Sequence, residues 1–164
     1  MKTTKEKRDK ERLKKEKLKV RELARKTKKQ FSRSKLVKEA DRVFSLYIRW
    51  RDSWKPCCTC GRSWEENFQC WHFQTRGNKR TRWLANNSHW QCPWCNNWWK
   101  GEQYLHSLFV DKKYWAWTAQ LLKEEALKID KVQDSEILET IQHYYKLCFE
   151  LWIDYKPKKQ FLWI

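Results

Sequence analysis

Two pairs of cysteines constrain the fold of this chain more than any other feature of its sequence. The first pair is Cys57 and Cys60, and the second is Cys92 and Cys95, each with the spacing Cys-x-x-Cys. Four thiolates in two such pairs can hold one tetrahedral Zn²⁺ at zinc–sulfur distances of about 2.3 Å. The ion would join the two ends of the segment between the pairs. The sequence therefore predicts a structural Zn²⁺ site formed by these four residues.

The remaining sequence favours a metal site over disulfides. The seven cysteines are an odd number, and the chain has neither a long apolar run nor an apolar segment after its first charged residues. We therefore expect no membrane span and no signal peptide, and a reducing cytoplasm in which such spacings bind metal. Cys58 is not expected to be a ligand, and Cys70 and Cys148 are expected to be plain buried thiols.

Basic residues are concentrated at the N-terminus. The chain has 37 Lys and Arg against 20 Asp and Glu, a net charge of +17. Residues 1–38 contain 18 of the basic and five of the acidic residues, a net +13. Such an arm is typical of nucleic-acid binding, because phosphates attract it irrespective of base sequence. A solvated basic helix or a disordered tail would show the same composition.

The hydrophobic pattern predicts an α+β fold, in which a zinc-bound ββα finger is flanked by helices and preceded by a basic arm that is helical or disordered. Apolar residues at helical spacing predict a helix over 34–51, ended by Pro56. We also expect strands over 68–73 and 82–90, and helices over 96–107, 114–129 and 134–153. The predicted segments are the arm at 1–33, the zinc-supported core with its leading helix at 34–110, and a helical segment at 111–164.

Two expectations concern packing. The last helix is predicted to begin at Asp134 or at a capping box of Ser135 and Glu139. Its buried stripe is predicted to be Ile137, Ile141, Tyr144, Tyr145, Cys148 and Leu151. The chain has 13 Trp and only three Gly, and we expect much of this aromatic surface to form the core, with some left to stack on bases.

The segment between the cysteine pairs has the residue types that phosphodiester cleavage needs. His72, on the first predicted strand, could act as the general base that activates water. Asn96, directly after Cys95, could bind a divalent ion, Mg²⁺ or Mn²⁺, that stabilises the leaving oxygen. Asn87 could hold the strand of His72 in position by hydrogen bonds. Predicted phosphate contacts are Arg76, Lys79, Arg80, Arg82 and Lys100.

Each of these side chains also has a purely structural interpretation. His72 lies between two aromatic residues and could be a packed core histidine. Asn96 could only cap a helix, and Asn87 could belong to a turn. His89 lies on the same predicted strand face as Asn87, where a structural role is favoured over substrate contact.

Taken together, these residues resemble the HNH (His-Me finger) nucleases, and more closely the NinG/Rap recombination proteins of lambdoid phages. The resemblance covers residues 20–110. Its motifs are Pro56-Cys-Cys-Thr-Cys-Gly61, His72-Phe73, Arg82-Trp83, Asn87-Ser-His89, Gln91-Cys-Pro-Trp-Cys-Asn96 and Gly101.

The resemblance implies a treble-clef-like ββα core and a structure-specific DNA endonuclease. It would cut branched recombination intermediates such as D-loops and Holliday junctions, in the cytoplasm of the bacterial host of a phage. The family's base, middle Asn and helix-start amide fall on His72, Asn87 and Asn96. A symmetric junction would suit a homodimer, although no dimer interface can be identified from the sequence.

The sequence departs from the family pattern at two places. Trp71 stands before His72, where the family usually has Gly. The family's stretch Cys-Asn-Gln-His-Lys reads Cys95-Asn-Asn-Trp-Trp here, so its His falls on Trp98. The alternative function is therefore a non-catalytic, zinc-dependent accessory protein that binds DNA or RNA, which requires neither His72 nor the two Asn.

Overall fold

The structure is a computed structural model, and it describes residues 11, 14–19, 32–63, 67–129 and 131–158. Residues 11 and 14–19 are helical and exposed, and Lys15 pairs with Glu11 at 3.2 Å. The rest of the predicted arm before residue 32 lies outside the described residues. Within the described part of the chain, no helix is both long enough and apolar enough to cross a membrane.

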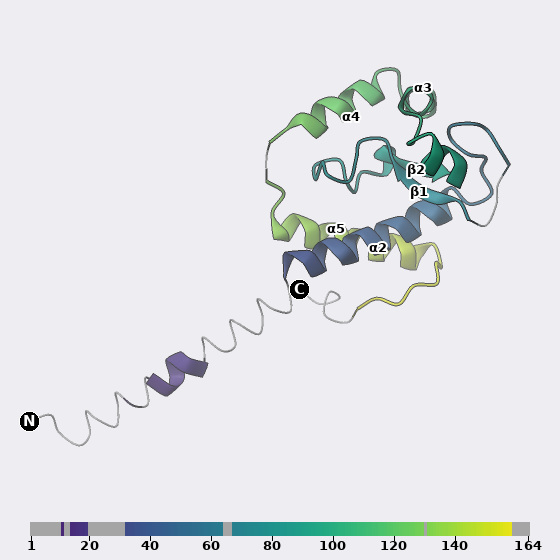
Figure 1. Ribbon diagram of the computed structural model, residues 1–164. Helices are drawn as coiled ribbons and strands as arrows, with labels where there is room; N and C mark the ends of the chain where they lie inside the picture. The colour runs from purple at the N-terminus through teal and green to yellow at the C-terminus, as the bar shows by residue number, and fades with distance from the viewer. Residues whose placement is uncertain (1–10, 12–13, 20–31, 64–66, 130, 159–164) are drawn as a thin grey trace, which may run out of the picture.

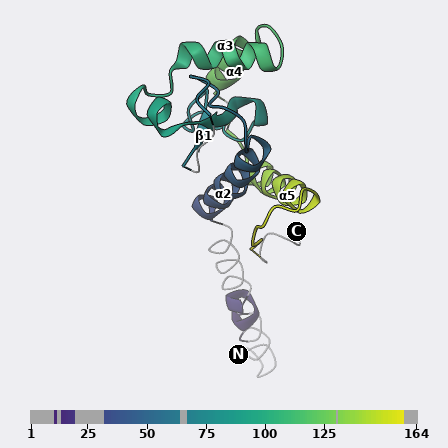
Figure 2. The same cartoon turned by 90° about the vertical axis from the view of Figure 1, so that its right-hand side faces the viewer.

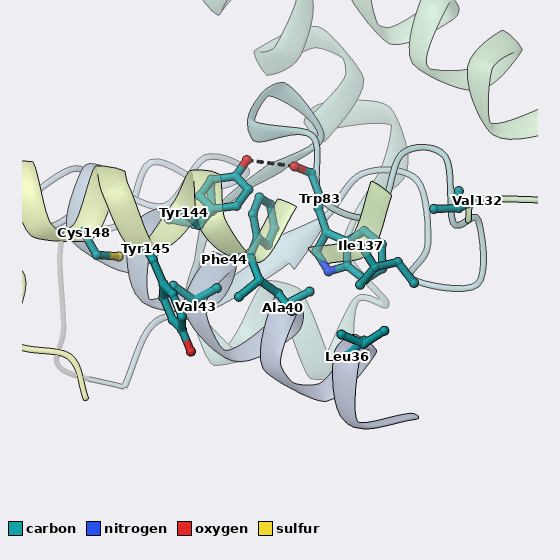
Figure 3. Packing of buried hydrophobic residues seen from close by; sticks show 12 residues of the cluster. Leu36, Ala40, Val43, Phe44, Trp83, Val132, Ile137, Tyr144, Tyr145 and Cys148 are labelled. Atoms are coloured by element: carbon teal, nitrogen blue, oxygen red, sulfur yellow. Dashed lines mark hydrogen bonds between the residues drawn. The ribbon is translucent and has the colours of Figure 1, made fainter. Parts of the chain in front are cut away.

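Two helices from opposite ends of the chain form the main hydrophobic core. Helix α2 (Arg33–Arg51) and helix α5 (Asp134–Glu150) lie side by side (Figures 1 and 2). Their apolar stripes meet around Phe44, beside which the Tyr144 hydroxyl donates to the Trp83 carbonyl at 2.8 Å (Figure 3). The buried members of this core are Leu36, Ala40, Val43, Phe44, Ile48, Trp83, Val132, Ile137, Ile141, Tyr144, Tyr145 and Cys148. Each large apolar side chain buried here contributes about 1.5–3 kcal/mol.

A short antiparallel hairpin lies between this helix pair and the remaining helices. Strand β1 (Gln69–His72) pairs with strand β2 (Ser88–Gln91), with Gln69 opposite Gln91 and His72 opposite Ser88. Successive strand residues face opposite sides of a sheet. The face that carries His72 packs on α2, since its ring lies 5.7 Å from that of Phe44. The opposite face carries His89, which contacts helix α3 (Gln103–Lys113).

The other elements are short. A 3₁₀ turn, η1 (Ala85–Asn87), precedes β2, and a π-helical turn, η2 (Trp94–Trp98), follows it. Helix α4 (Thr118–Leu127) packs against α3 on the far side of the hairpin from α2 and α5 (Figure 2). The protein is thus mostly helical, with a two-stranded antiparallel hairpin and a four-cysteine cluster able to bind a metal. The predicted helix over 34–51 is confirmed.

Three predicted elements are wrong in their extent. The second strand was expected over 82–90, but residues 82 and 83 lie in a turn, residues 85–87 form η1, and only 88–91 pair with β1. The helix expected at 96–107 is the η2 turn followed by α3, because residues 100–102 all have a positive φ, between 44° and 86°. The helix expected at 114–129 begins only at Thr118.

The last helix ends at Glu150, and its predicted cap is displaced. The carboxylate of Glu136 accepts the backbone N–H of Gln133 at 2.5 Å, so the N-cap is Gln133, two residues before Ser135 of the predicted box, and the helix begins at Asp134, the alternative start. Its buried stripe is as expected, except that Leu151 is only half-buried.

The expectation that tryptophan forms much of the core is wrong. Among the described tryptophans only Trp83 and Trp90 are buried, and Trp71 is half-buried. The exposed ones are Trp50, Trp54, Trp94, Trp98, Trp99, Trp115, Trp117 and Trp152. The core between α2 and α5 consists mainly of aliphatic residues, Phe44 and two tyrosines, and Trp83 is the one tryptophan among its described buried members.

The division of the chain into segments 1–33, 34–110 and 111–164 stays a prediction. The boundary between residues 110 and 111 falls inside α3, and α5 of the third segment shares one core with α2 of the second.

Candidate metal centre and active site

The four cysteines of the two pairs come together at one end of the hairpin. Their Sγ atoms all lie within 4.8 Å of one another, and those of Cys60 and Cys92 are 3.8 Å apart. Sulfurs around a tetrahedral zinc with bonds of about 2.3 Å lie about 3.8 Å from each other. The cluster therefore has the donor type and the spacing of a structural zinc site.

Backbone turns bring each cysteine pair into position. The Gly61 N–H donates to the Cys57 carbonyl at 3.0 Å, and Gly61 takes φ +70°, which a residue with a side chain rarely adopts. In the second pair, the Asn96 N–H donates to the Cys92 carbonyl at 3.0 Å. The Cys92 N–H points to the Cys57 sulfur at 3.4 Å, so one pair supports the other.

The cluster is covered on its inner side by aromatic residues. Phe68 and Trp90 pack with Cys57, Cys92 and Cys95, while Cys60 remains exposed. Burial, followed by hydrogen bonds to the other thiols, raises the pKa of Cys95. A hydrogen bond from the Cys58 thiol lowers the pKa of Cys57. Thiols packed together without a cation cannot all ionise, and a bound Zn²⁺ would remove that conflict.

His72 lies at the opposite end of β1 and is held in one tautomer. Its side chain is buried, and Nε2 lies 2.9 Å from the carbonyl oxygen of Arg82. Because a carbonyl can only accept, Nε2 must carry the proton and Nδ1 is the basic nitrogen. Nδ1 has no hydrogen-bond partner among the described residues. It is not fully shielded from solvent, so a water molecule can reach it. Burial lowers the pKa of His72 to about 4, so the ring is neutral at pH 7.

Asn87 fixes the loop that supplies this carbonyl. Its Oδ1 accepts the Gln74 N–H at 2.7 Å, while Nδ2 donates to the carbonyls of Gln74 at 3.0 Å and Thr81 at 2.9 Å. The side chain is fully buried, so these bonds are shielded from water. The amide thus ties the chain just after His72 to the residue just before Arg82.

The side chain of Arg82 is anchored as well. Its guanidinium forms two hydrogen bonds with Asp41 of α2, at 2.8 and 2.6 Å, and a third with the Arg76 carbonyl at 2.7 Å. The Trp83 indole also donates to Asp41, at 2.9 Å. Asp41, on α2, therefore holds residues 82 and 83 in place, and the carbonyl of Arg82 in turn orients His72. Sequence reasoning missed this residue, since a single Asp on a helix gives no signal of its distant partner.

Asn96 is not brought next to His72. Its side-chain amide donates to the Gln69 side chain, at the other end of β1. Gln69 and His72 also face opposite sides of the hairpin, three residues apart, or about 10 Å along a strand. The described residues contain no second cluster of three or more His, Cys, Asp or Glu. The predicted magnesium role of Asn96 stays a prediction, and the geometry does not join it to His72.

The predicted phosphate contacts fall into two groups. Arg76, Lys79 and Lys100 are exposed, and the charge of Arg76 contributes to the low pKa of His72, so it lies near the ring. Arg80 pairs with Glu125 at 3.2 Å and Glu136 at 3.6 Å. A cleft of about 550 Å³ adjoins this loop; its basic lining residues are Arg33, Lys79, Arg80, Lys128 and Lys131.

A second histidine pair lies on the other face of the hairpin. His89 Nδ1 is 3.0 Å from His106 Nε2, and His89 Nε2 is 3.2 Å from the Tyr114 hydroxyl. Both rings are fully buried, and burial lowers the pKa of His106 to about 4 and that of His89 to about 2. This network joins β2 to α3, and His89 also lines a cavity of about 450 Å³ beside Cys57, Phe109 and Lys113. No pattern in the sequence connects His89 with His106 or Tyr114, because the three residues come from separate elements.

One comparison with known proteins gives a result. A family model described as NinG, bacteriophage lambda NinG protein, matches residues 1–151. Neither the curated proteins nor the solved structures gave a match to this chain.

Proposed function

The chain belongs to the NinG family, that of the bacteriophage lambda NinG protein, and we propose that it is a DNA endonuclease in which His72 is the general base. Its substrates would be branched recombination intermediates, D-loops and Holliday junctions, and it would act in the cytoplasm of the bacterial host. The NinG resemblance supports this choice of substrate.

The observation that carries the proposal is the 2.9 Å contact between His72 Nε2 and the Arg82 carbonyl oxygen, from which the tautomer of His72 follows. The Arg82 carbonyl keeps the proton on Nε2, which leaves Nδ1 free to accept a proton from water. Asn87 and Asp41 hold that carbonyl from two sides, and Arg82 is thereby a positioning residue rather than a phosphate contact. The pKa of about 4 keeps the ring neutral, and an approaching phosphate would raise it towards the working pH.

The other residues of the site would bind the DNA or hold the hairpin in place. Arg76, close to the ring, would contact the scissile phosphate, and the basic cleft beside it would hold the flanking strand. Zinc at the cysteine cluster would fix the end of the hairpin and take no part in the chemistry. Dependence on Mg²⁺ or Mn²⁺ is proposed on the resemblance alone.

Cleavage of labelled DNA by a matched pair of variants tests this proposal. His72→Gln keeps an amide that can donate to the Arg82 carbonyl but lacks a basic nitrogen. We expect it to lose about 10²–10⁴-fold in cleavage of four-way junctions with Mg²⁺ or Mn²⁺, with binding and thermal midpoint nearly unchanged. The control is His143→Ala, an exposed histidine on α5. Equal cleavage by His72→Gln and the unmodified chain would rule out His72 as the base.

The accessory-protein alternative predicts a different result. If the chain only binds DNA or RNA, junction binding will be tight and no metal will support cutting, whatever residue stands at 72.

A further inference from the structure

Two tryptophans next to the second cysteine pair form an exposed aromatic stack. The rings of Trp94 and Trp98 lie 5.6 Å apart between centroids and only 28° from parallel. Their residues are 46% and 71% exposed, and the neighbouring Trp99 is 50% exposed. Large aromatic surface held in water costs free energy, and the described part of the core does not use these rings. Their exposure therefore calls for a ligand.

The stack is fixed on a rigid support. Both tryptophans belong to η2, which is tied at its start by the bond from Asn96 N–H to the Cys92 carbonyl. The Trp99 N–H closes the turn on the Trp94 carbonyl at 3.3 Å, and the Gly101 N–H bonds the Cys95 carbonyl at 2.9 Å. Two of the anchoring carbonyls thus belong to members of the cysteine cluster. A preformed platform loses little entropy when a flat ligand stacks on it.

The charge of the segment that carries the stack favours a nucleic acid. From Asn67 to Gly101 the chain contains no Asp or Glu and has five basic residues. Lys100 is next to the tryptophans in sequence, whereas Arg76, Lys79, Arg80 and Arg82 belong to the loop that follows His72, at the other end of β1. Lys100 is exposed and directly follows Trp98 and Trp99. Aromatic faces beside cations are the usual means of binding single-stranded DNA, because every base has a π-face and every linkage a phosphate.

We propose that Trp94 and Trp98 form a stacking platform for an unpaired nucleobase of DNA. Bases within a duplex already stack on their neighbours and offer no free face. The platform therefore selects strands in which a base is unpaired, as at a branch point. This inference rests on the proposed function only in taking DNA as the ligand, and it requires neither cleavage nor the base role of His72.

Equilibrium binding without added Mg²⁺ or Mn²⁺ tests the platform separately from cleavage. The probes are a fluorescein-labelled junction with two unpaired thymines at its centre and a fully paired duplex of equal length. We expect Trp98→Ala to bind the first about 5- to 150-fold more weakly and the duplex less than twofold more weakly. Trp98→Phe should restore most of the loss, because it keeps a stacking face.

Two further readouts separate stacking from charge and from misfolding. The slope of log Kd against log salt should not change in Trp98→Ala, because no phosphate contact is removed. A 2-aminopurine at the unpaired position should lose fluorescence on binding the unmodified chain, and lose much less with Trp98→Ala. The matched control is Trp115→Ala, whose residue is 81% exposed between α3 and α4.

Several outcomes would overturn the platform. They are unchanged binding of the unpaired junction by Trp98→Ala, an equal loss on the duplex, or an equal loss in Trp115→Ala. The first would point to a protein partner for these rings. Absence of cleavage by the unmodified chain would instead count against the proposed function and leave the platform standing, provided the difference between the two probes persists.

Discussion

Replacing Gly101 with alanine should destabilise the protein for two separable reasons. Gly101 has φ +86°, a left-handed conformation. An added Cβ would also lie 2.3 Å from Nε1 of Trp71, 2.6 Å from Cε2 and 2.7 Å from Cζ2, far inside contact distance. The indole of Trp71 therefore packs where any other residue at position 101 would place its side chain.

The expected cost follows from these two effects. The left-handed backbone costs a residue with a side chain about 1–2 kcal/mol. Overpacking of the added methyl group against the Trp71 indole costs about 1–3 kcal/mol. Gly101→Ala should therefore lower the free energy of unfolding by about 2–5 kcal/mol.

The two other glycines separate these contributions. Gly61 has φ +70° but nothing within 4 Å of an added Cβ, so Gly61→Ala should show only the backbone cost. Gly77 has no positive φ, and its nearest atom, Thr75 Oγ1, lies at an ordinary 3.5 Å. Gly77→Ala should be close to neutral.

Urea denaturation at saturating Zn²⁺ measures all three variants. A further variant, Trp71→Leu combined with Gly101→Ala, should recover the steric part of the loss but not the backbone part. If Gly101→Ala were no more destabilised than Gly61→Ala, or if the double change recovered nothing, the packing of Trp71 on Gly101 would be refuted.

Two more predictions concern zinc and pH. Cys95→Ser should lose the single zinc measured by elemental analysis and unfold the hairpin, whereas Cys148→Ser, at a buried cysteine outside the cluster, should keep its zinc; a zinc-loaded, folded Cys95→Ser protein would contradict this. The pKa of His72 is lowered to about 4 by burial, whereas an unfolded histidine titrates near about 6.5. The unfolded state therefore binds more protons between these values, and stability falls with decreasing pH in that window, by about 1.4 kcal/mol per unit for this residue. His72→Gln should remove that part of the slope in urea titrations from pH 7 to 4.5, and an unchanged slope would show that His72 is not buried in its neutral form.

Local patterns predicted those parts of the fold that local chemistry determines. The cysteine spacing predicted the cluster, and its four sulfurs do converge. The apolar period predicted α2 and the buried stripe of α5, because each helix needs one face against the core. The identity of the metal stays a prediction, as do the roles of His72, Asn87 and Asn96.

The errors arose where distant contacts decide the conformation. The loop before β2 is held by the Asn87 side chain, which bonds to Gln74 and Thr81, so it needs no ladder of strand hydrogen bonds. The break between η2 and α3 depends on a left-handed turn at Gly101, which a run of helix-compatible residues concealed. The exposure of the tryptophans could not be predicted from the sequence either, since hydrophobicity alone assigns such residues to a core.

The pairing of α2 with α5 sets the order in which the protein can assemble during synthesis. The cysteine cluster needs only residues up to 95, and β1 and β2 can pair as soon as that segment leaves the ribosome. The core that backs His72 through Phe44 cannot close until residues 134–150 have been made. A nascent chain could thus bind a metal ion at the four cysteines before the core that backs His72 has closed.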